Sequence, residues 1–110
     1  MVNVLNSLKE TQEILEKEAA VLIYFSAPSC NVCHVLKPKV FEATKKYYEK
    51  MHCTEVNIAN TPDIGVHFNV LSAPTVIIFL NGKEFVRESR AFSVEGMFAK
   101  VERPYEILFS

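Results

Sequence analysis

The feature that most constrains the fold is an apolar run, AAVLIYF over residues 19–25, which leads directly into a proline-flanked pair of cysteines. The run is continuous rather than alternating and is rich in β-branched and aromatic residues, which is typical of a central strand buried on both faces. Pro28 holds Ala27 in an extended conformation and ends this strand. A second run, TVIIFL over 75–80, predicts another buried strand.

Amphipathic segments lie around these apolar runs. A helix is predicted over 7–18, where Ser7 and Glu10 have the spacing of a capping box. A second helix is expected to begin near Cys30 and to be kinked at Pro38, because proline removes a hydrogen bond to the previous turn. Three- and four-residue steps predict its buried face, which consists of Val32, Val35, Leu36, Val40, Phe41, Tyr47 and Tyr48. Its solvated face is predicted to carry Lys37, Lys39, Lys45 and Lys46.

Shorter patterns complete the order of elements. Further strands are predicted over 2–5, 53–58 and 83–90, and further helices over 60–69 and after Ser93. Asn81-Gly82 is a strong two-residue hairpin signal, so the last strand is expected to return antiparallel at the sheet edge. Pro104 is expected to end or bend the final helix. The alternation predicts one α/β domain over 1–110, with a central mixed sheet of about five strands flanked by about four helices.

Composition excludes several functional classes. The chain has 12 basic and 13 acidic side chains, a formal net charge of −1, and no charged block that indicates a nucleic-acid or membrane surface. Its longest apolar runs are far shorter than the ~20 residues of a membrane helix. The N-terminus has neither the basic nor the apolar region of a signal peptide. Three cysteines are an odd number for a disulfide-stapled secreted domain, so we expect a cytoplasmic protein.

Cys30 and Cys33 have the spacing of a redox dithiol, and they follow a buried strand where a helix is expected to begin. A thiolate, not a thiol, attacks a disulfide. A helix N-terminus offers unpaired N–H groups and the positive end of the helix dipole, which favour a thiolate. We therefore predict that Cys30 is the exposed nucleophile and that Cys33, one turn further on, resolves the mixed disulfide.

With these features, the chain resembles the thioredoxin family over nearly its whole length. The resemblance rests on the strand at 20–25 running into APSCNVCHVLKP, and on FNVLSAPTVIIFLNGK over 68–83. It implies the thioredoxin fold, a cis peptide bond before Pro74, and an outward-turned Ala73 backbone that pairs with an extended substrate. The substrate-binding residues implied are Val32, Ala73, Pro74 and Thr75.

The resemblance also implies an activity, the reduction of protein disulfides. Such an enzyme needs no bound cofactor, but an external reductase or thiol reductant must recycle its oxidised dithiol. Disulfide-containing proteins are its expected partners, with no nucleic acid and no membrane. Its expected place is electron transport and redox homeostasis in the cytoplasm.

Several residues depart from the family pattern. Ser29 replaces the usual tryptophan, and Asn31-Val32 replaces the usual Gly-Pro between the cysteines, so the redox potential cannot be carried over. Tyr24 takes the position of the buried strand aspartate, and Glu55 that of a nearby lysine.

This double change motivates a hypothesis about proton transfer. We expect Tyr24 and Glu55 to point to the same side of the sheet, so that Glu55, oriented by the Tyr24 hydroxyl, deprotonates Cys33. In the alternative, Glu55 points to solvent and water takes the proton. His34, as an imidazolium beside Cys33, is a candidate for favouring a thiolate.

Other functions of the cysteine motif remain open at this level. Cys30 to His34 also matches the haem-attachment pattern, but the chain lacks an export signal and its apolar segments leave no haem cavity. A zinc site needs four ligands, and the remaining candidates, His52, Cys53 and His67, form no second pair. Cys53 is predicted to be a small buried hydrophobe.

The sequence is also compatible with two functions other than disulfide reduction. One is an oxidant or isomerase that uses the same dithiol in another direction. The other is a non-catalytic binding module with an apolar surface near Val32 and Pro74, which would need neither cysteine.

Overall fold

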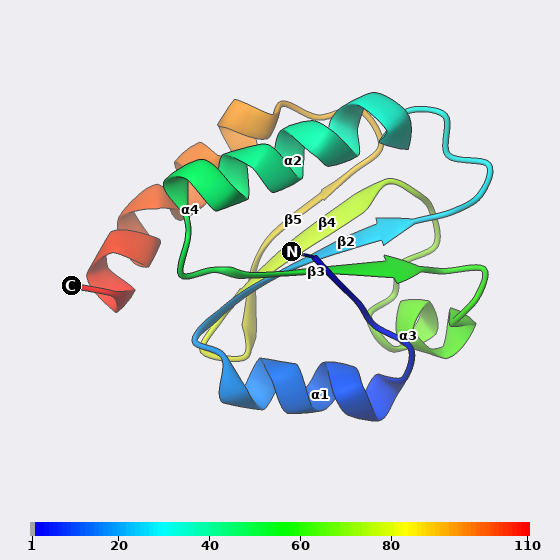
Figure 1. Cartoon of the computed structure of the whole chain (residues 1–110), viewed down its shortest axis with the longest axis horizontal. Coiled ribbons are helices and arrows are strands. Elements are labelled where there is room, and N and C mark those ends of the chain that lie inside the picture. The colour runs from blue at the N-terminus through cyan, green and yellow to red at the C-terminus, as the bar shows by residue number, and fades with distance from the viewer. Residues whose placement is uncertain (1) are drawn as a thin grey trace.

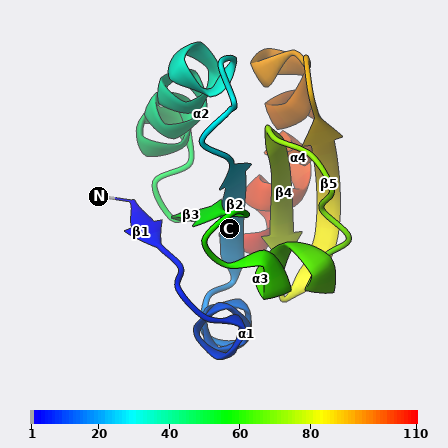
Figure 2. The same ribbon diagram turned by 90° about the vertical axis from the view of Figure 1, so that its right-hand side faces the viewer.

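The computed structural model describes residues 2–110, and its centre is a five-stranded mixed sheet in the order β1-β3-β2-β4-β5, with helices on both faces (Figure 1). The strands are β1 (Asn3–Val4), β2 (Ala20–Ser26), β3 (His52–Asn57), β4 (Thr75–Leu80) and β5 (Lys83–Ser89). The helices are α1 (Leu8–Lys17), α2 (Cys33–Tyr47), α3 (Pro62–His67) and α4 (Val94–Leu108). The first three strands are mutually parallel, and β4 and β5 are antiparallel to their neighbours (Figure 2). The predicted fold class and element order are confirmed.

β2 occupies the middle of the sheet and is buried at every position. One set of its side chains, Ala20, Leu22 and Tyr24, packs with residues of α2 and α4. The alternate set, Val21, Ile23 and Phe25, packs on the opposite face with residues that include Leu8 of α1 and Ile64 of α3. A strand buried on both faces has no polar side to alternate with, which explains the continuous apolar run in the sequence.

The start of α2 differs from the prediction, because the helix begins at Cys33 rather than near Cys30. The chain leaves β2 through two successive turns, in which the Cys30 N–H donates to Ala27 (3.0 Å) and the Cys33 N–H donates to Cys30 (3.3 Å). The first helical i+4 bond runs from the Leu36 N–H to the Val32 carbonyl, at 3.0 Å. These turns use the residues that the prediction placed in the first helical turn. Pro38 lies inside the helix, which continues to Tyr47.

The buried face of α2 is also narrower than predicted. It consists of Cys33, Leu36, Val40 and Thr44, followed by Tyr48 just beyond the helix. Val32, Val35 and Tyr47 are each more than half exposed, so their assignment to the core is wrong. Val35 is one residue from Leu36, a rotation of about 100° that turns it away from the sheet.

Helix α4 continues through Pro104 to Leu108, so of the two expected outcomes at this proline, an end of the helix is wrong and a bend stays a prediction. Its last turns are held by aromatic contacts: the Tyr105 ring lies 5.0 Å from the Tyr48 ring and 4.8 Å from the Phe109 ring, between centroids. The Tyr105 hydroxyl also accepts a hydrogen bond from the Lys50 N–H, at 3.0 Å. Tertiary packing thus compensates for the loss of the backbone hydrogen bond that proline cannot make.

The predicted caps and hairpin are present. Ser7 Oγ accepts from the Glu10 N–H at 3.1 Å, although the Glu10 carboxylate reaches Asn6 rather than the cap residue itself. Asn81 and Gly82 both have positive φ, 53° and 78°, as a tight two-residue hairpin requires. β5 therefore returns antiparallel to β4 as the outer strand.

The conformation of Gly82 predicts a stability effect. Gly82→Ala should lower the free energy of unfolding by about 1 kcal/mol, since an L-residue with a side chain is disfavoured at this φ. Chemical denaturation of the oxidised protein measures the change. An unchanged midpoint with an unchanged denaturant dependence would contradict the importance of this turn.

Candidate active site

Cys30 and Cys33 form a disulfide at the junction of β2 and α2, with their Cα atoms 5.4 Å apart. Cys33 is the first residue of α2 and is only 6% exposed, whereas Cys30 is half-buried in the preceding turn. The N-terminus of α2 brings the positive end of its helix dipole to this pair. The pair therefore consists of one more accessible sulfur and one sheltered sulfur, joined across a single turn.

The loop before β4 lies at the same end of the sheet as this disulfide. Thr75 pairs with Phe25 near the end of β2, and the Ala73–Pro74 peptide bond is cis, as expected. Pro74 is buried, its carbonyl accepts from the Arg90 N–H at 2.8 Å, and Thr75 Oγ1 donates to the Ser72 carbonyl at 2.8 Å. These bonds fix the loop from both sides.

Two apolar side chains near these segments remain exposed to solvent. Val32, between the cysteines, is 52% exposed, and Leu71, three residues before Pro74, is 90% exposed. Val32 was predicted from the sequence as a site residue, and Leu71 was not. The only sequence signal for Leu71 is an apolar residue in a loop, where no periodicity assigns it to a core.

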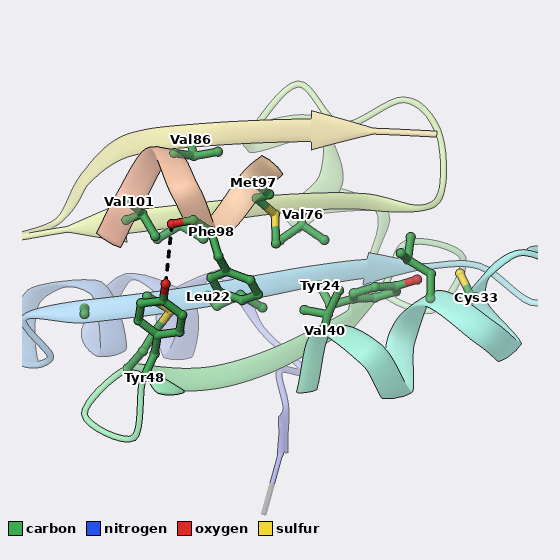
Figure 3. Close-up of a cluster of buried hydrophobic side chains, with 14 residues drawn as sticks. Leu22, Tyr24, Cys33, Val40, Tyr48, Val76, Val86, Met97, Phe98 and Val101 are labelled. Atoms are coloured by element: carbon green, nitrogen blue, oxygen red, sulfur yellow. Dashed lines mark hydrogen bonds between the residues drawn. The ribbon is translucent and has the colours of Figure 1, made fainter. Parts of the chain in front are cut away.

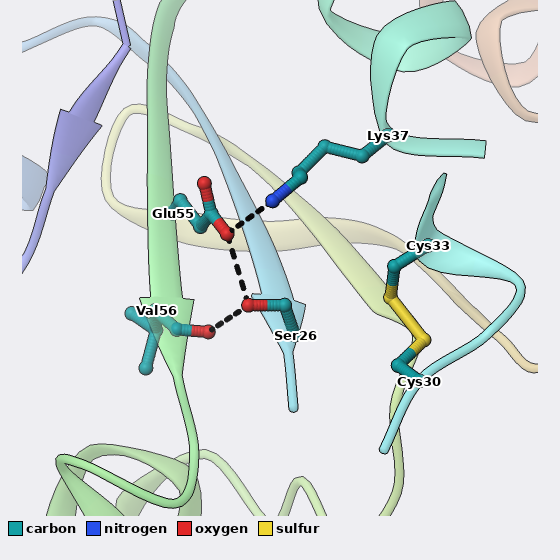
Figure 4. Close-up of polar contacts among 6 residues, drawn as sticks. All are labelled: Ser26, Cys30, Cys33, Lys37, Glu55 and Val56. Carbon is teal, nitrogen blue, oxygen red and sulfur yellow. Dashed lines mark hydrogen bonds and ion pairs between the residues drawn. A yellow bond between two sulfur atoms is a disulfide. The ribbon is translucent and has the colours of Figure 1, made fainter. Parts of the chain in front are cut away.

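Glu55 faces α2 and carries a network of polar contacts beside the disulfide (Figure 4). Its Oε2 accepts from Lys37 Nζ at 2.8 Å and from Ser26 Oγ at 2.9 Å. Its side chain is 18% exposed, so the expectation that Glu55 points to solvent is wrong, and the choice between Glu55 and water as the proton acceptor stays a prediction. Lys37 belongs to this ion pair and not only to a solvated helix face, which corrects a second expectation.

Ser26 and Lys37 were not predicted from the sequence as partners of Glu55. Spacing places each of them on the same face as a predicted site residue, but the contact with Glu55 depends on how β2, β3 and α2 pack together. Ser26 lies two residues after Tyr24 on β2 and therefore on the same face of the sheet. Lys37 lies four residues after Cys33 on α2 and therefore on the same face of the helix.

Tyr24 lies next to Glu55 in the register of β2 and β3 and on the same side, as predicted. Its side chain is fully buried, and its ring packs edge-on against Phe41, at 5.7 Å between centroids. Its hydroxyl does not orient Glu55, because it has no hydrogen-bond partner among residues 2–110. Burial, and to a lesser degree the charge of Glu55, raises the pKa of Tyr24 to about 12, so the hydroxyl keeps its proton at physiological pH.

The thioredoxin family model matches residues 2–103. The chain belongs to the thioredoxin family. It is 38% identical over 71 residues to the chloroplastic thioredoxin M5 of Oryza sativa, a match that covers 64% of this chain and 41% of that protein. It is 26% identical over 103 residues to the thioredoxin-like protein YdfQ of Bacillus subtilis, covering 94% and 91% of the two chains. The chain thus spans less than half the length of the rice relative and most of the bacterial one.

Two solved thioredoxin structures share the fold of this chain. A cysteine-to-serine mutant of Entamoeba histolytica thioredoxin matches with a TM-score of 0.81 and 25% identity, covering 94% of this chain and 99% of that one. Thioredoxin from Plasmodium falciparum matches with a TM-score of 0.81 and 24% identity, covering 93% and 98%.

The remaining candidates lie apart from the disulfide of this thioredoxin-family chain or at its surface. His34 follows Cys33 and is exposed. Cys53 is half-buried on β3 and forms no disulfide. Within residues 2–110, no three His, Cys, Asp or Glu side chains are grouped to hold a metal, and no helix is long and apolar enough to cross a membrane.

Cys53 is expected to be a slow nucleophile. Burial is the main cause that raises its pKa from 9.0 to about 11, although a hydrogen bond with Thr44 acts in the opposite direction. The thiolate fraction at pH 8 is therefore about a hundredfold below that of an ordinary thiol. Alkylation by iodoacetamide of the oxidised protein, in which Cys53 is the remaining thiol, should be slower by about that factor in the native than in the denatured state. Equal native and denatured rates would contradict this.

Proposed function

We propose that this protein is a thiol–disulfide oxidoreductase that reduces disulfide bonds in other proteins. The observation that carries the proposal is the Cys30–Cys33 disulfide at the β2–α2 junction, with the second sulfur buried behind the first. Membership of the thioredoxin family supports it. This placement suits a two-step exchange, because a substrate can reach the Cys30 sulfur while the Cys33 sulfur lies buried next to it.

The proposed reaction begins with the reduced dithiol. The Cys30 thiolate attacks one sulfur of a substrate disulfide; that bond breaks, and the departing substrate sulfur takes up a proton. Cys33 then loses its proton and attacks the Cys30 sulfur, which releases the second substrate thiol and forms the Cys30–Cys33 disulfide. Two electrons pass from the dithiol to the substrate. An external reductase or thiol reductant returns them, and the exchange requires no bound cofactor.

We propose that an extended substrate segment binds beside the dithiol along Val32, Ala73, Pro74 and Thr75. The exposed Val32 supports this role, since an apolar side chain between the cysteines gives a substrate surface to contact. Leu71, which is exposed in the loop before β4, adds a second apolar side chain that a substrate could contact. The Ala73 backbone would supply strand-like hydrogen bonds to the substrate.

We propose that Glu55 accepts the proton of Cys33 during the second step. Its carboxylate is held by Ser26 and Lys37 rather than by Tyr24, and its second oxygen, Oε1, makes no hydrogen bond or ion pair within residues 2–110. His34 is exposed beside Cys33, where its charged form would favour a nearby thiolate.

We propose a cytoplasmic location and a role in electron transport and redox homeostasis. The odd, small number of cysteines supports a reducing compartment. Several relatives are chloroplastic by name, and that location is a property of those proteins.

The roles of the two cysteines predict opposite trapping behaviour. With Cys53→Ser as the common background, a further Cys33→Ser change should accumulate mixed disulfides with reducible substrate proteins, because no thiol resolves them. A further Cys30→Ser change should accumulate none. Non-reducing electrophoresis and mass spectrometry measure the products. Trapping through Cys33 in the Cys30→Ser variant would reverse the assignment, and partner binding unaffected by either change would favour the binding-module alternative.

The role of Glu55 predicts a defect confined to the second step. Glu55→Gln should slow the release of the mixed disulfide by about tenfold to a hundredfold and leave the first attack by Cys30 unchanged. Stopped-flow measurements with excess substrate separate the two rates.

Glu88 provides a matched control, because it also forms an ion pair, with Lys100 at 2.7 Å, and its side chain is 21% exposed. Glu88→Gln should change neither rate. A resolution rate in Glu55→Gln equal to that of wild type would show that Glu55 is not the proton acceptor.

A further inference from the structure

The Tyr24 hydroxyl is the one buried side-chain oxygen or nitrogen between residues 2 and 110 that has no hydrogen-bond partner. Its residue is fully buried at the centre of the sheet. An unpaired buried hydroxyl is costly, because water satisfies the same group in the unfolded chain. A fold that retains such a group requires an explanation.

The hydroxyl lies on the side of the ring that faces the dithiol. In Figure 3 the Tyr24 ring extends along the sheet, and its oxygen points toward the end at which Cys33 lies. Tyr24 and Cys33 belong to the same buried cluster, and Cys30 packs against that cluster. A side chain longer than aspartate thus projects from this β2 position toward the sheltered sulfur.

The other groups around Tyr24 do not provide an acceptor. Glu55 on β3 is the charged group that acts on Tyr24; its Oε2 accepts from Lys37 and Ser26, and although its Oε1 makes no such contact, the Tyr24 hydroxyl donates no hydrogen bond to it. The residues of β4 and α4 in the same cluster are apolar: Val76, Met97, Phe98 and Val101. His34 on α2 is exposed. Among the buried members of this cluster, Cys33 is therefore the one that becomes a strong acceptor, and it does so only as a thiolate, whereas Cys30 is only partly buried against the cluster.

We propose that the Tyr24 hydroxyl donates a hydrogen bond to the Cys33 thiolate and thereby stabilises the reduced form of the protein. In the disulfide, the Cys33 sulfur carries no charge, so the hydroxyl remains without a strong acceptor. After reduction, ionised Cys33 supplies one. Tyr24 thus acts on the resolving cysteine as a donor, whereas a carboxylate at this position would act as a proton acceptor.

The chemistry balances with glutathione as the reductant. Two glutathione molecules lose two electrons and become glutathione disulfide, the Cys30–Cys33 bond breaks, and the protein gains two thiols. Loss of a proton from Cys33 then creates the thiolate that Tyr24 contacts. Tyr24 itself stays protonated throughout, as its raised pKa requires.

Tyr24→Phe tests this inference by removing only the hydroxyl. The equilibrium constant for oxidation of the dithiol by glutathione disulfide should rise about tenfold at about pH 9.5. For a two-electron couple this corresponds to a potential lower by about 30 mV. At about pH 5, where Cys33 is a thiol, the same constant should change by less than about twofold. His34 and Glu55 are present in both proteins, so their contributions cancel in the comparison.

A direct titration gives a second measurement. In the reduced Cys30→Ser variant, the thiolate absorbance of Cys33 should appear about one pH unit higher when Tyr24→Phe is added. Cys53, whose pKa is raised by burial to about 11, is removed from the signal by Cys53→Ser in both variants.

Tyr48→Phe is the matched control. Tyr48 belongs to the same cluster but lies at the opposite end of β2, where its hydroxyl donates to the Phe98 carbonyl at 3.5 Å (Figure 3). Its loss should leave the equilibrium constant and the Cys33 titration unchanged. An equal effect of the two variants, or an effect of Tyr24→Phe that does not depend on pH, would assign Tyr24 a merely structural role and overturn the inference.

The inference rests on the redox activity proposed above, and the same experiment separates the two. A wild-type disulfide that does not exchange with glutathione would overturn both. Normal exchange in wild type, with no change in Tyr24→Phe, would overturn only the role of Tyr24.

Discussion

The complete burial of β2 is the constraint on which the rest of the structure depends. A strand buried on both faces requires a helical layer on each side, which α2 and α4 provide on one face and α1 and α3 on the other. Its polar chemistry must therefore lie at its end, where the chain emerges and turns into α2. The dithiol lies at this point, so the burial of β2 on both faces also determines where the two sulfurs lie.

The polar groups beneath the dithiol differ from those that the family resemblance implies. The central strand carries a neutral hydroxyl at Tyr24, and the carboxylate lies on the neighbouring strand at Glu55, where Lys37 and Ser26 hold it. Acceptance of a proton and stabilisation of the resulting thiolate are thereby assigned to different side chains in our proposals. This division permits each function to be removed by one conservative substitution.

Long apolar runs and turn signals were sufficient to predict an α/β fold with a central mixed sheet. The buried strands and the Asn81-Gly82 hairpin follow from local pattern, because burial on both faces and positive φ restrict residue choice strongly. The start of α2 could not be predicted from local pattern, because the hydrogen-bonded turns after Ala27 move the first helical residue to Cys33. The partners of Glu55 were also missed, because an ion pair between a strand and a helix depends on how the two elements pack. Helix propensity likewise could not show that α4 continues beyond Pro104, because that continuation depends on the packing of Tyr105 against Tyr48.

Transfer of electrons from the dithiol to a protein disulfide tests the central claim most directly. The fully reduced Cys53→Ser variant would be mixed with an equimolar disulfide-containing protein such as insulin, quenched with acid and analysed by mass spectrometry. The account predicts that one substrate disulfide is lost for each Cys30–Cys33 disulfide formed, with a transient mixed disulfide through Cys30. An unchanged substrate disulfide beside a dithiol that remains reduced would contradict it.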